Sequence, residues 1–304
     1  MMKYKPVIFH SLSQLHQAMG QAPPRHPLVS VINYGDAHFN PADFEHGIVL
    51  DFYKISFKTS FSGQLKYGQG FYDFEEGGMS FVAPGQILKM QDEEADYDGM
   101  TLHIHPDFLR PYPIGNHITR YGFFSYSASE ALYLSEKEKS IILSIYCFIR
   151  DELNERIDRF SQDVMIAQIE LLLAYAERFY DRQFLTRKAV NHDLLAKLEE
   201  TIKTYFEEEK ALKNGLPSVQ DLALQLHVTP RYLSDLMKNL LGLTAQQWIH
   251  ERVIEKSKEY LAKREMGIAE IAYQLGFEHP QSFNKLFKGK TLLSPSEYRK
   301  TLLN

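Results

Sequence analysis

The C-terminal third of the chain contains the same residue pattern twice, and this repeat constrains the fold more than any other feature. "DLALQLHVTPRYLSDLM" covers residues 221–237, and "EIAYQLGFEHPQSFNKLF" covers residues 270–287. Apolar and polar positions correspond between the copies, with one additional residue in the second. The region must therefore form two equivalent local structures.

Each copy predicts two short helices joined by a tight turn. The second helix begins at Thr229-Pro230 in the first copy and near Pro280 in the second. Threonine is a good N-cap, and proline suits the first helical position because its missing N–H has no partner there. We expect six apolar residues of the second helices to face inward: Leu233, Leu236, Met237, Phe283, Leu286 and Phe287.

A helix, a tight turn and a helix with a polar outer face is the helix-turn-helix layout, whose second helix fits the major groove of DNA. Paired amphipathic helices also build solenoids, but a solenoid needs about three or more repeats. The two copies are joined by a predicted helix that a Thr244/Gln247 capping box opens. Held about 34 Å apart, both second helices would enter successive major grooves.

The tandem pattern resembles the AraC/XylS family of transcription regulators over roughly residues 200–302. The resemblance is carried by "LPSVQDLALQLHVTPRYLSDLMKNLLGLTAQQWI" and "GIAEIAYQLGFEHPQSFNKLFKGKTLLSPSEYRK". It implies a sequence-specific, double-stranded DNA-binding regulator, not an enzyme, that responds to a small molecule or a partner. Members are often dimeric through helices after the sensor domain, and a contact with RNA polymerase is a further expectation.

Two positions depart from the family's pattern. The first turn has His227 where the family usually has glycine, and Leu292 stands where glycine usually follows the last repeated helix. The turn position needs a positive φ, which histidine tolerates better than bulkier residues do. Since Gly289 lies three residues before Leu292, we expect that helix either to end early or to have a reshaped C-terminus.

The resemblance, carried over position by position, assigns the residues that contact DNA. Asparagine and glutamine suit adenine, and arginine and lysine suit guanine. Asp235 either accepts from cytosine or pairs with Arg231 one turn earlier. The expected base contacts are Arg231, Ser234, Asp235, Gln281, Ser282, Asn284 and Lys285, and the expected phosphate contacts are Lys238, Lys288 and Lys290.

The N-terminal part predicts a β domain followed by helices. Residues from about 26 to 105 are rich in β-branched and aromatic residues, with glycine and proline at turn-like intervals. Closely spaced strands indicate a small antiparallel barrel or sandwich, which looks like the cupin-type sensor of many family members. Helices are expected over about 134–185, opened by a Ser135/Glu138 capping box. Some barrel aromatics could line a ligand pocket, but the sequence does not say which.

The chain is thus predicted to be an α+β protein of two domains. Residues 1–185 form a cupin-like sensor and dimerisation domain, residues 186–215 a helical linker, and residues 216–304 a helical DNA-binding domain. Within the last, the first helix-turn-helix unit spans about 218–241, the linking helix 245–263 and the second unit 267–290. The helix over 162–183 is apolar on more than one side, so it is either fully buried or a homodimer contact.

Composition agrees with this organisation. A length of 304 residues favours two domains. Residues 216–304 carry 12 Lys and Arg against 9 Asp and Glu, whereas the remaining residues have a net charge of −8. No signal peptide or membrane span is expected, and the single Cys147 excludes an internal disulfide. A cytoplasmic protein without a cofactor is the resulting expectation.

A metal-dependent cupin-type enzyme is the alternative. His103 and His105 alternate on a predicted strand, so both would project from one face and could hold iron or zinc. A third ligand in useful spacing is missing, and Pro106-Asp107 follows where metal-binding cupins place a glutamate. The other interpretation is that both are ordinary residues near a strand end, and no catalytic or metal site is predicted.

Overall fold

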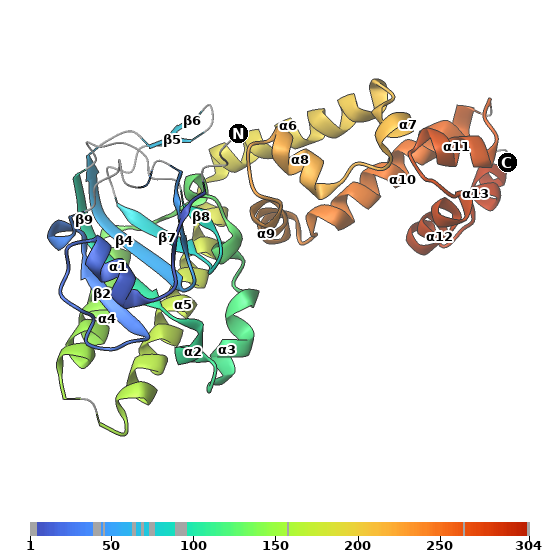
Figure 1. Ribbon diagram of the computed structural model, residues 1–304. Helices are drawn as coiled ribbons and strands as arrows, with labels where there is room; N and C mark the ends of the chain where they lie inside the picture. The colour runs from blue at the N-terminus through green and yellow to red at the C-terminus, as the bar shows by residue number, and fades with distance from the viewer. Residues whose placement is uncertain are drawn as a thin grey trace. The chain divides into compact units, whose positions relative to one another are not determined.

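The computed structural model describes residues 5–38, 44, 46–62, 65–67, 70–72, 77–88, 96–156, 158–263 and 265–302. These fall into two compact units, Met1–Gln183 (unit 1) and Phe184–Asn304 (unit 2). Unit 1 is rich in β-structure and unit 2 is helical (Figure 1). The chain therefore has a β-rich N-terminal part and an all-helical C-terminal part, as expected.

Unit 1 contains an antiparallel five-stranded sheet in the order β10-β7-β4-β9-β2. Its strands are β2 (Val29–Asn33), β4 (Tyr53–Ser62), β7 (Gly78–Val82), β9 (Asp96–Ile104) and β10 (Leu132–Tyr133). A three-stranded sheet is formed by β1 (Val7–Phe9), β3 (Ile48–Leu50) and β8 (Ile87–Leu88), and a hairpin by β5 (Leu65–Tyr67) and β6 (Gly70–Tyr72).

The three-stranded sheet contains one parallel pair, β1 with β3, and β1 lies before the predicted β region of about 26–105. A parallel pair needs a long crossover, and the chain between these strands includes helix α1 (Leu12–Ala18) and β2. The apolar residues of α1, β1 and β3 form one buried cluster with Ile32 and Phe52. This cluster fixes the three-stranded sheet and α1 against the larger sheet.

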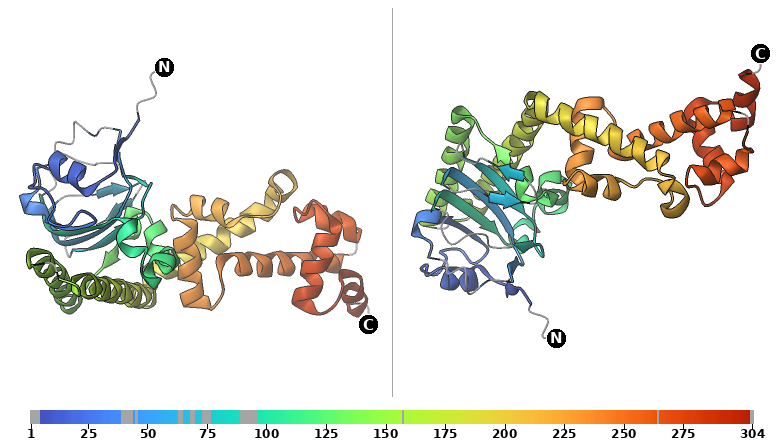
Figure 2. Two further views of the ribbon diagram at one scale, coloured as in Figure 1. Left: turned by 60° about the horizontal axis from the view of Figure 1, so that its bottom comes forward. Right: turned by 90° about the horizontal axis from the view of Figure 1, so that it is seen from above.

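One face of the five-stranded sheet is apolar and packs against two helices. Register places Ile55 opposite Phe81 and Leu102. Helix α4 (Glu136–Asn154) contacts this face through Tyr146, whose hydroxyl donates to the carbonyl of Ile55 at 2.8 Å. Helix α5 (Ser161–Thr186) contacts it too, since the ring of Tyr180 lies 6.2 Å from that of Phe81. Figure 2 shows α4 and α5 along one side of the sheet and α1 on the other.

The opposite face of the same sheet is polar, although it is buried as well. Ser30 and Lys54 lie opposite His103 in one cross-strand row, and Ser56 lies opposite Thr101 in the next. Ser30, Ser56, Thr101 and His103 are all buried, and the ring of Phe52 meets that of His103 edge-on at 5.7 Å. Unit 1 therefore encloses a polar layer on the side that faces α1.

The helices of unit 1 agree with the sequence in their caps and faces. The Ser135/Glu138 capping box is present at the start of α4. In α5 most apolar residues from Met165 to Tyr180 are buried, while Leu171 is exposed. Two short helices, α2 (Pro106–Leu109) and α3 (Pro113–His117), follow β9.

Unit 2 is built on a single hydrophobic cluster to which all its longer helices contribute. Its elements are α6 (Lys188–Glu207), α7 (Lys210–Asn214), α8 (Val219–Gln225), α9 (Pro230–Leu241), α10 (Ala245–Lys263), α11 (Ile268–Gln274), α12 (Pro280–Thr291) and α13 (Pro295–Thr301). Figure 2 shows α10 as the long helix between the pair α8–α9 and the pair α11–α12.

The stretch predicted as a linker, residues 186–215, packs into this cluster. Leu198, Ile202 and Tyr205 of α6 are buried among the residues of α8 and α10. Gly276 approaches Gly215 so closely that an added Cβ would lie 2.5 Å from the carbonyl carbon of Gly215. The structure thus places α6 and α7 in unit 2.

The structure shows how α12 ends at Leu292. The helix runs past Gly289 to Thr291, so of the two alternatives the early end is wrong and the reshaped C-terminus is present. Leu292 itself takes the left-handed conformation, with φ 65°, in the position that Gly242 occupies after α9 with φ 73°. The side chain of Leu292 is 84% exposed, so little apolar burial offsets the strain.

Replacing this leucine by glycine should therefore stabilise unit 2. A left-handed non-glycine residue costs about 1–2 kcal/mol, part of which the greater freedom of glycine in the unfolded chain cancels. We expect Leu292→Gly to raise the free energy of unfolding by up to about 1 kcal/mol. Trp248, the one tryptophan of the chain, lies in unit 2, so its fluorescence reports this transition.

The reverse exchange after α9 is the matched control. Nothing lies within 4 Å of a Cβ built on Gly242, so Gly242→Ala adds backbone strain without a clash. It should lower the free energy of unfolding by about 1 kcal/mol. If both variants changed the free energy of unfolding in the same direction, the assignment of strain to Leu292 would be contradicted.

His103 should make unit 1 sensitive to acid. Burial, together with Lys54 and His16 nearby, holds the pKa of His103 well below its ordinary value. Below about pH 6.5 the unfolded chain takes up a proton that the folded chain does not, so stability falls by up to about 1.4 kcal/mol per pH unit. In His103→Gln this slope, measured by far-ultraviolet circular dichroism, should flatten. If the slope of stability against pH is unchanged in His103→Gln, other groups cause the acid sensitivity. His117→Gln, at an exposed histidine, is the control for a histidine-to-glutamine exchange.

Candidate nucleic-acid interface

The turns of the two helix pairs have the same backbone geometry. His227 has φ 56° and Gly276 has φ 92°, so the histidine takes the left-handed conformation that the sequence predicted for it. In each turn an N–H bonds to the carbonyl five residues earlier, which closes the end of the first helix. These bonds run from Val228 to Ala223 and from Phe277 to Ala272, both at 3.0 Å.

The second helix of each pair buries one side and presents the other. Thr229 caps α9 by accepting from the N–H of Tyr232 at 3.2 Å, and Pro280 begins α12. The inward faces are confirmed, since Leu286 is partly buried and the other five predicted residues are fully buried: Leu233, Leu236, Met237, Phe283 and Phe287. The opposite sides of α9 and α12 carry the predicted DNA contacts.

The outer side of α9 is engaged in contacts within unit 2. The Nε of Arg231 lies 2.8 Å from Oδ2 of Asp235, so the intrahelical ion pair that was one alternative for Asp235 is present. The hydroxyl of Ser234 accepts from the N–H of Ala245, the first residue of α10, at 3.3 Å. Lys238 is exposed. Ser234 therefore ties α9 to the next helix.

The outer side of α12 is different, because most of its polar side chains are exposed and make no side-chain hydrogen bond or ion pair within the described residues. Within the part of the chain that the structure describes, five of them make no side-chain hydrogen bond or ion pair: Gln281, Ser282, Asn284, Lys285 and Lys288. Lys290 lies 3.6 Å from the carboxylate of Glu251 in α10. This row of amide and ammonium groups can meet base edges and phosphates without breaking an internal contact.

Helix α10 sets the separation of the two pairs. Its 19 residues span about 28 Å. Trp248 and Ile249 at one end and Leu261 at the other are buried in the cluster that both pairs share. The predicted Thr244/Gln247 capping box is formed, with bonds of 2.9 and 3.3 Å. The length of α10 is thus somewhat less than one DNA turn, about 34 Å.

The histidine pair that suggested a metal site is not assembled. His103 is buried within β9, whereas His105 follows the strand and caps α2, where its Nδ1 accepts from the N–H of Asp107 at 3.2 Å. Among the described residues, no three His, Cys, Asp or Glu side chains are grouped to hold a metal ion. The described helices include none long and apolar enough to span a membrane.

Sequence reasoning missed the buried polar layer of unit 1. Lys54, Ser56 and Lys58 alternate with apolar residues along β4, which signals a two-faced strand. A polar face is normally taken as solvent-exposed, and the sequence alone gives no reason to expect it to be covered. Burial and the nearby Lys54 lower the pKa of Lys58 to about 7.

Comparison with known proteins identifies the helical region. Residues 222–301 match a family model described as a helix-turn-helix domain. The Bacillus subtilis protein YisR, an uncharacterised HTH-type transcriptional regulator, is 36% identical over 83 residues, which are 27% of this chain and 29% of YisR. The arabinose operon regulatory protein of Escherichia coli is 28% identical over 38% of this chain and 41% of its own length.

The C-terminal region is an AraC-type helix-turn-helix domain. Among solved structures, the C-terminal domain of AraT, a response regulator from Geobacillus stearothermophilus, shares 28% identity with it. That match covers 36% of this chain and 84% of the AraT domain, with a TM-score of 0.31. The matched part of this chain spans less than a third of the first curated relatives, so the likeness concerns the AraC-type domain and not the whole protein.

Ser234 should contribute to the stability of the AraC-type domain through its bond to α10. Loss of one hydrogen bond costs about 0.5–1.5 kcal/mol, so Ser234→Ala should lower the free energy of unfolding by about that amount, read from Trp248 fluorescence. Ser282→Ala is the matched control, because this exposed serine of α12 should change stability by less than about 0.5 kcal/mol. If Ser234→Ala and Ser282→Ala lowered the free energy of unfolding equally, the bond from Ser234 to α10 would not contribute to stability.

Proposed function

We propose that the protein is a sequence-specific, double-stranded DNA-binding transcriptional regulator rather than an enzyme. The observation that carries the proposal is the free polar row of α12, repeated in position by α9, in a domain of the AraC type. In this proposal α8–α9 and α11–α12 are two helix-turn-helix units. A DNA-binding role makes a cytoplasmic location part of the same proposal.

The two units would bind DNA in different ways. Gln281 and Asn284 have the amide groups that suit adenine, and Lys285 suits guanine. Lys288 and Lys290 lie further along α12, where phosphates are the expected partners. Arg231 and Asp235 would have to separate, or contact DNA as a pair, because they already bond to each other. We therefore assign base reading mainly to α12, with α9 contributing through Arg231, Ser234, Asp235 and Lys238.

Unit 1 would serve as a cupin-like sensor that also supports dimerisation. Two packed layers of strands around a buried polar face supply a site where a small effector could bind. Leu171 of α5 and Phe148 of α4 are exposed apolar residues on the two long helices, which supports a homodimer contact that includes 162–183. A contact with RNA polymerase would couple DNA binding to transcription.

Exchanges in α12 test the assignment of base and phosphate contacts. Asn284→Ala should cost about 1–3 kcal/mol of binding free energy at one base pair and relax preference there. Lys288→Ala should weaken all sequences alike and reduce the salt slope by about one unit. Gel retardation of the full chain on its own upstream DNA, over a salt series and a set of single-base variants, measures both effects.

Lys197→Ala controls for the loss of one positive charge, because this exposed lysine lies on α6, a helix that carries none of the predicted DNA contacts. It should leave sequence preference unchanged. Binding that is equally tight to every duplex and unaffected by Asn284→Ala would exclude sequence-specific reading by α12.

A further inference from the structure

Arg231 and Asp235 form an ion pair on the outer side of α9, where DNA contacts are predicted. The Nε of Arg231 lies 2.8 Å from Oδ2 of Asp235, and the two side chains are 50% and 24% exposed. Both residues lie in the N-terminal half of α9, the part of a recognition helix that meets base edges. The pair therefore lies where sequence would be read, although a carboxylate repels the phosphates of DNA.

The equivalent positions of α12 carry no such pair. Counted from the proline that begins each helix, Arg231 corresponds to Gln281. Asp235 corresponds to Lys285 in the same way. Within the described residues, the side chains of Gln281 and Lys285 are exposed and make no hydrogen bond or ion pair. The charge at the later position is thus reversed between the two helices, and the aspartate lowers the attraction of α9 for the DNA backbone.

The bonded pair has the donors and acceptors that match a C·G base pair in the major groove. Guanine presents two adjacent acceptors, N7 and O6, and the planar fork of a guanidinium pairs with both. Cytosine presents its N4 amino group beside O6, and a carboxylate oxygen accepts from it. The observed bond uses one nitrogen of Arg231 and one oxygen of Asp235, so it is compatible with both base contacts. An A·T pair lacks two adjacent acceptors and does not match the fork.

We infer that Arg231 and Asp235 together recognise one C·G base pair, with Arg231 at the guanine and Asp235 at the cytosine. Because the ion pair exists before DNA binds, Arg231 loses less side-chain freedom on binding than an unsupported arginine does. Asp235 also repels phosphates, so it weakens binding to DNA that lacks the C·G pair at this position. Asp235 thereby contributes specificity rather than affinity, and α9 joins α12 in reading bases.

This assignment rests on the DNA-binding function proposed above, and it decides for contact as a pair over separation of Arg231 from Asp235. The two proposals fail in different ways. A wild-type chain without any sequence preference would remove both. A wild-type chain whose preference depends on Asn284 but not on Asp235 would remove only the recognition of C·G by α9.

Site selection by the full chain tests the inference. The probe is a pool of duplexes with about 25 random base pairs, enough for two half-sites one helical turn apart. Single-base variants of the selected duplex are then titrated with each protein over a salt series. For the wild type, one C·G pair should be required at a position that Asn284→Ala does not affect. Its replacement by G·C or A·T should weaken binding roughly fivefold to a hundredfold.

Two variants assign that base pair to α9. Asp235→Asn keeps the size of the side chain, but its amide nitrogen donates, so preference for cytosine should fall by about fivefold or more. Its binding to unrelated duplex should tighten roughly threefold to tenfold, because one negative charge no longer opposes the phosphates. Arg231→Ala should abolish the preference for guanine at the same base pair. Since both variants act on one base pair, their effects should be non-additive.

Asp193→Asn is the matched control, because this exposed aspartate lies on α6, which carries none of the predicted DNA contacts. It should leave base preference and affinity for unrelated duplex unchanged. If Asp235 only supported α9, Asp235→Asn would lower the melting temperature and leave base preference unchanged. That result, or weaker binding of Asp235→Asn to unrelated duplex, would overturn the inference.

Discussion

Burial of α10 is the constraint on which the rest of the helical unit depends. Trp248, Ile249 and Leu261 of α10 are buried in one cluster with residues of both helix pairs. Because protein interiors are close-packed, we expect this shared cluster to hold α9 and α12 in one arrangement. We therefore expect the two outer faces to move as one body rather than as two tethered modules.

The two copies of the repeat share their backbone structure, but their outer side chains make different contacts. The turns at His227 and Gly276 close with equivalent hydrogen bonds. On α9, however, polar side chains bond to one another and to α10. On α12 Lys290 pairs with Glu251 of α10, but the described side chains of Gln281, Ser282, Asn284, Lys285 and Lys288 are exposed without such bonds. The same local fold thus has an outer surface with internal polar contacts on α9 and an outer surface that is open to a partner on α12.

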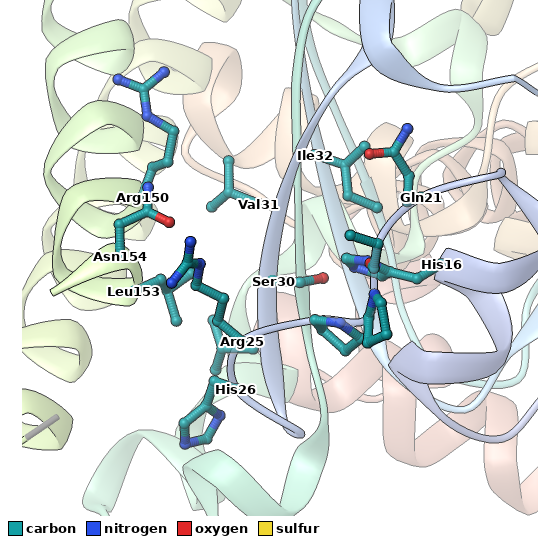
Figure 3. A pocket seen from close by; sticks show the side chains of 14 residues that line it. His16, Gln21, Arg25, His26, Ser30, Val31, Ile32, Arg150, Leu153 and Asn154 are labelled. Carbon is teal, nitrogen blue, oxygen red and sulfur yellow. The ribbon is translucent and has the colours of Figure 1, made fainter. Parts of the chain in front are cut away.

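Local features were predictable from sequence and long-range ones were not. Caps such as Thr229 and inward residues such as Leu233 depend on neighbours within two turns, so spacing alone identifies them. The parallel pairing of β1 with β3 depends on segments about forty residues apart. Alternation along β4 reveals two faces, but which face is covered depends on where α1 and α4 pack. The pocket beside β2 is likewise lined by segments that are far apart in the sequence, α1, β2 and the end of α4, so no local motif predicts it (Figure 3).

The close approach of Gly276 to Gly215 has a practical consequence for dissecting the molecule. The second turn rests on the chain just before α8, where Tyr205 of α6 also bonds to the carbonyl of Gly215 at 2.9 Å. Phe184 reaches Tyr232 of α9 edge-on, with ring centroids 5.3 Å apart. A fragment cut at residue 216 would strip away these supports and expose the underside of the cluster. We therefore expect a fragment that starts near residue 184 to be more stable than one that starts at residue 216.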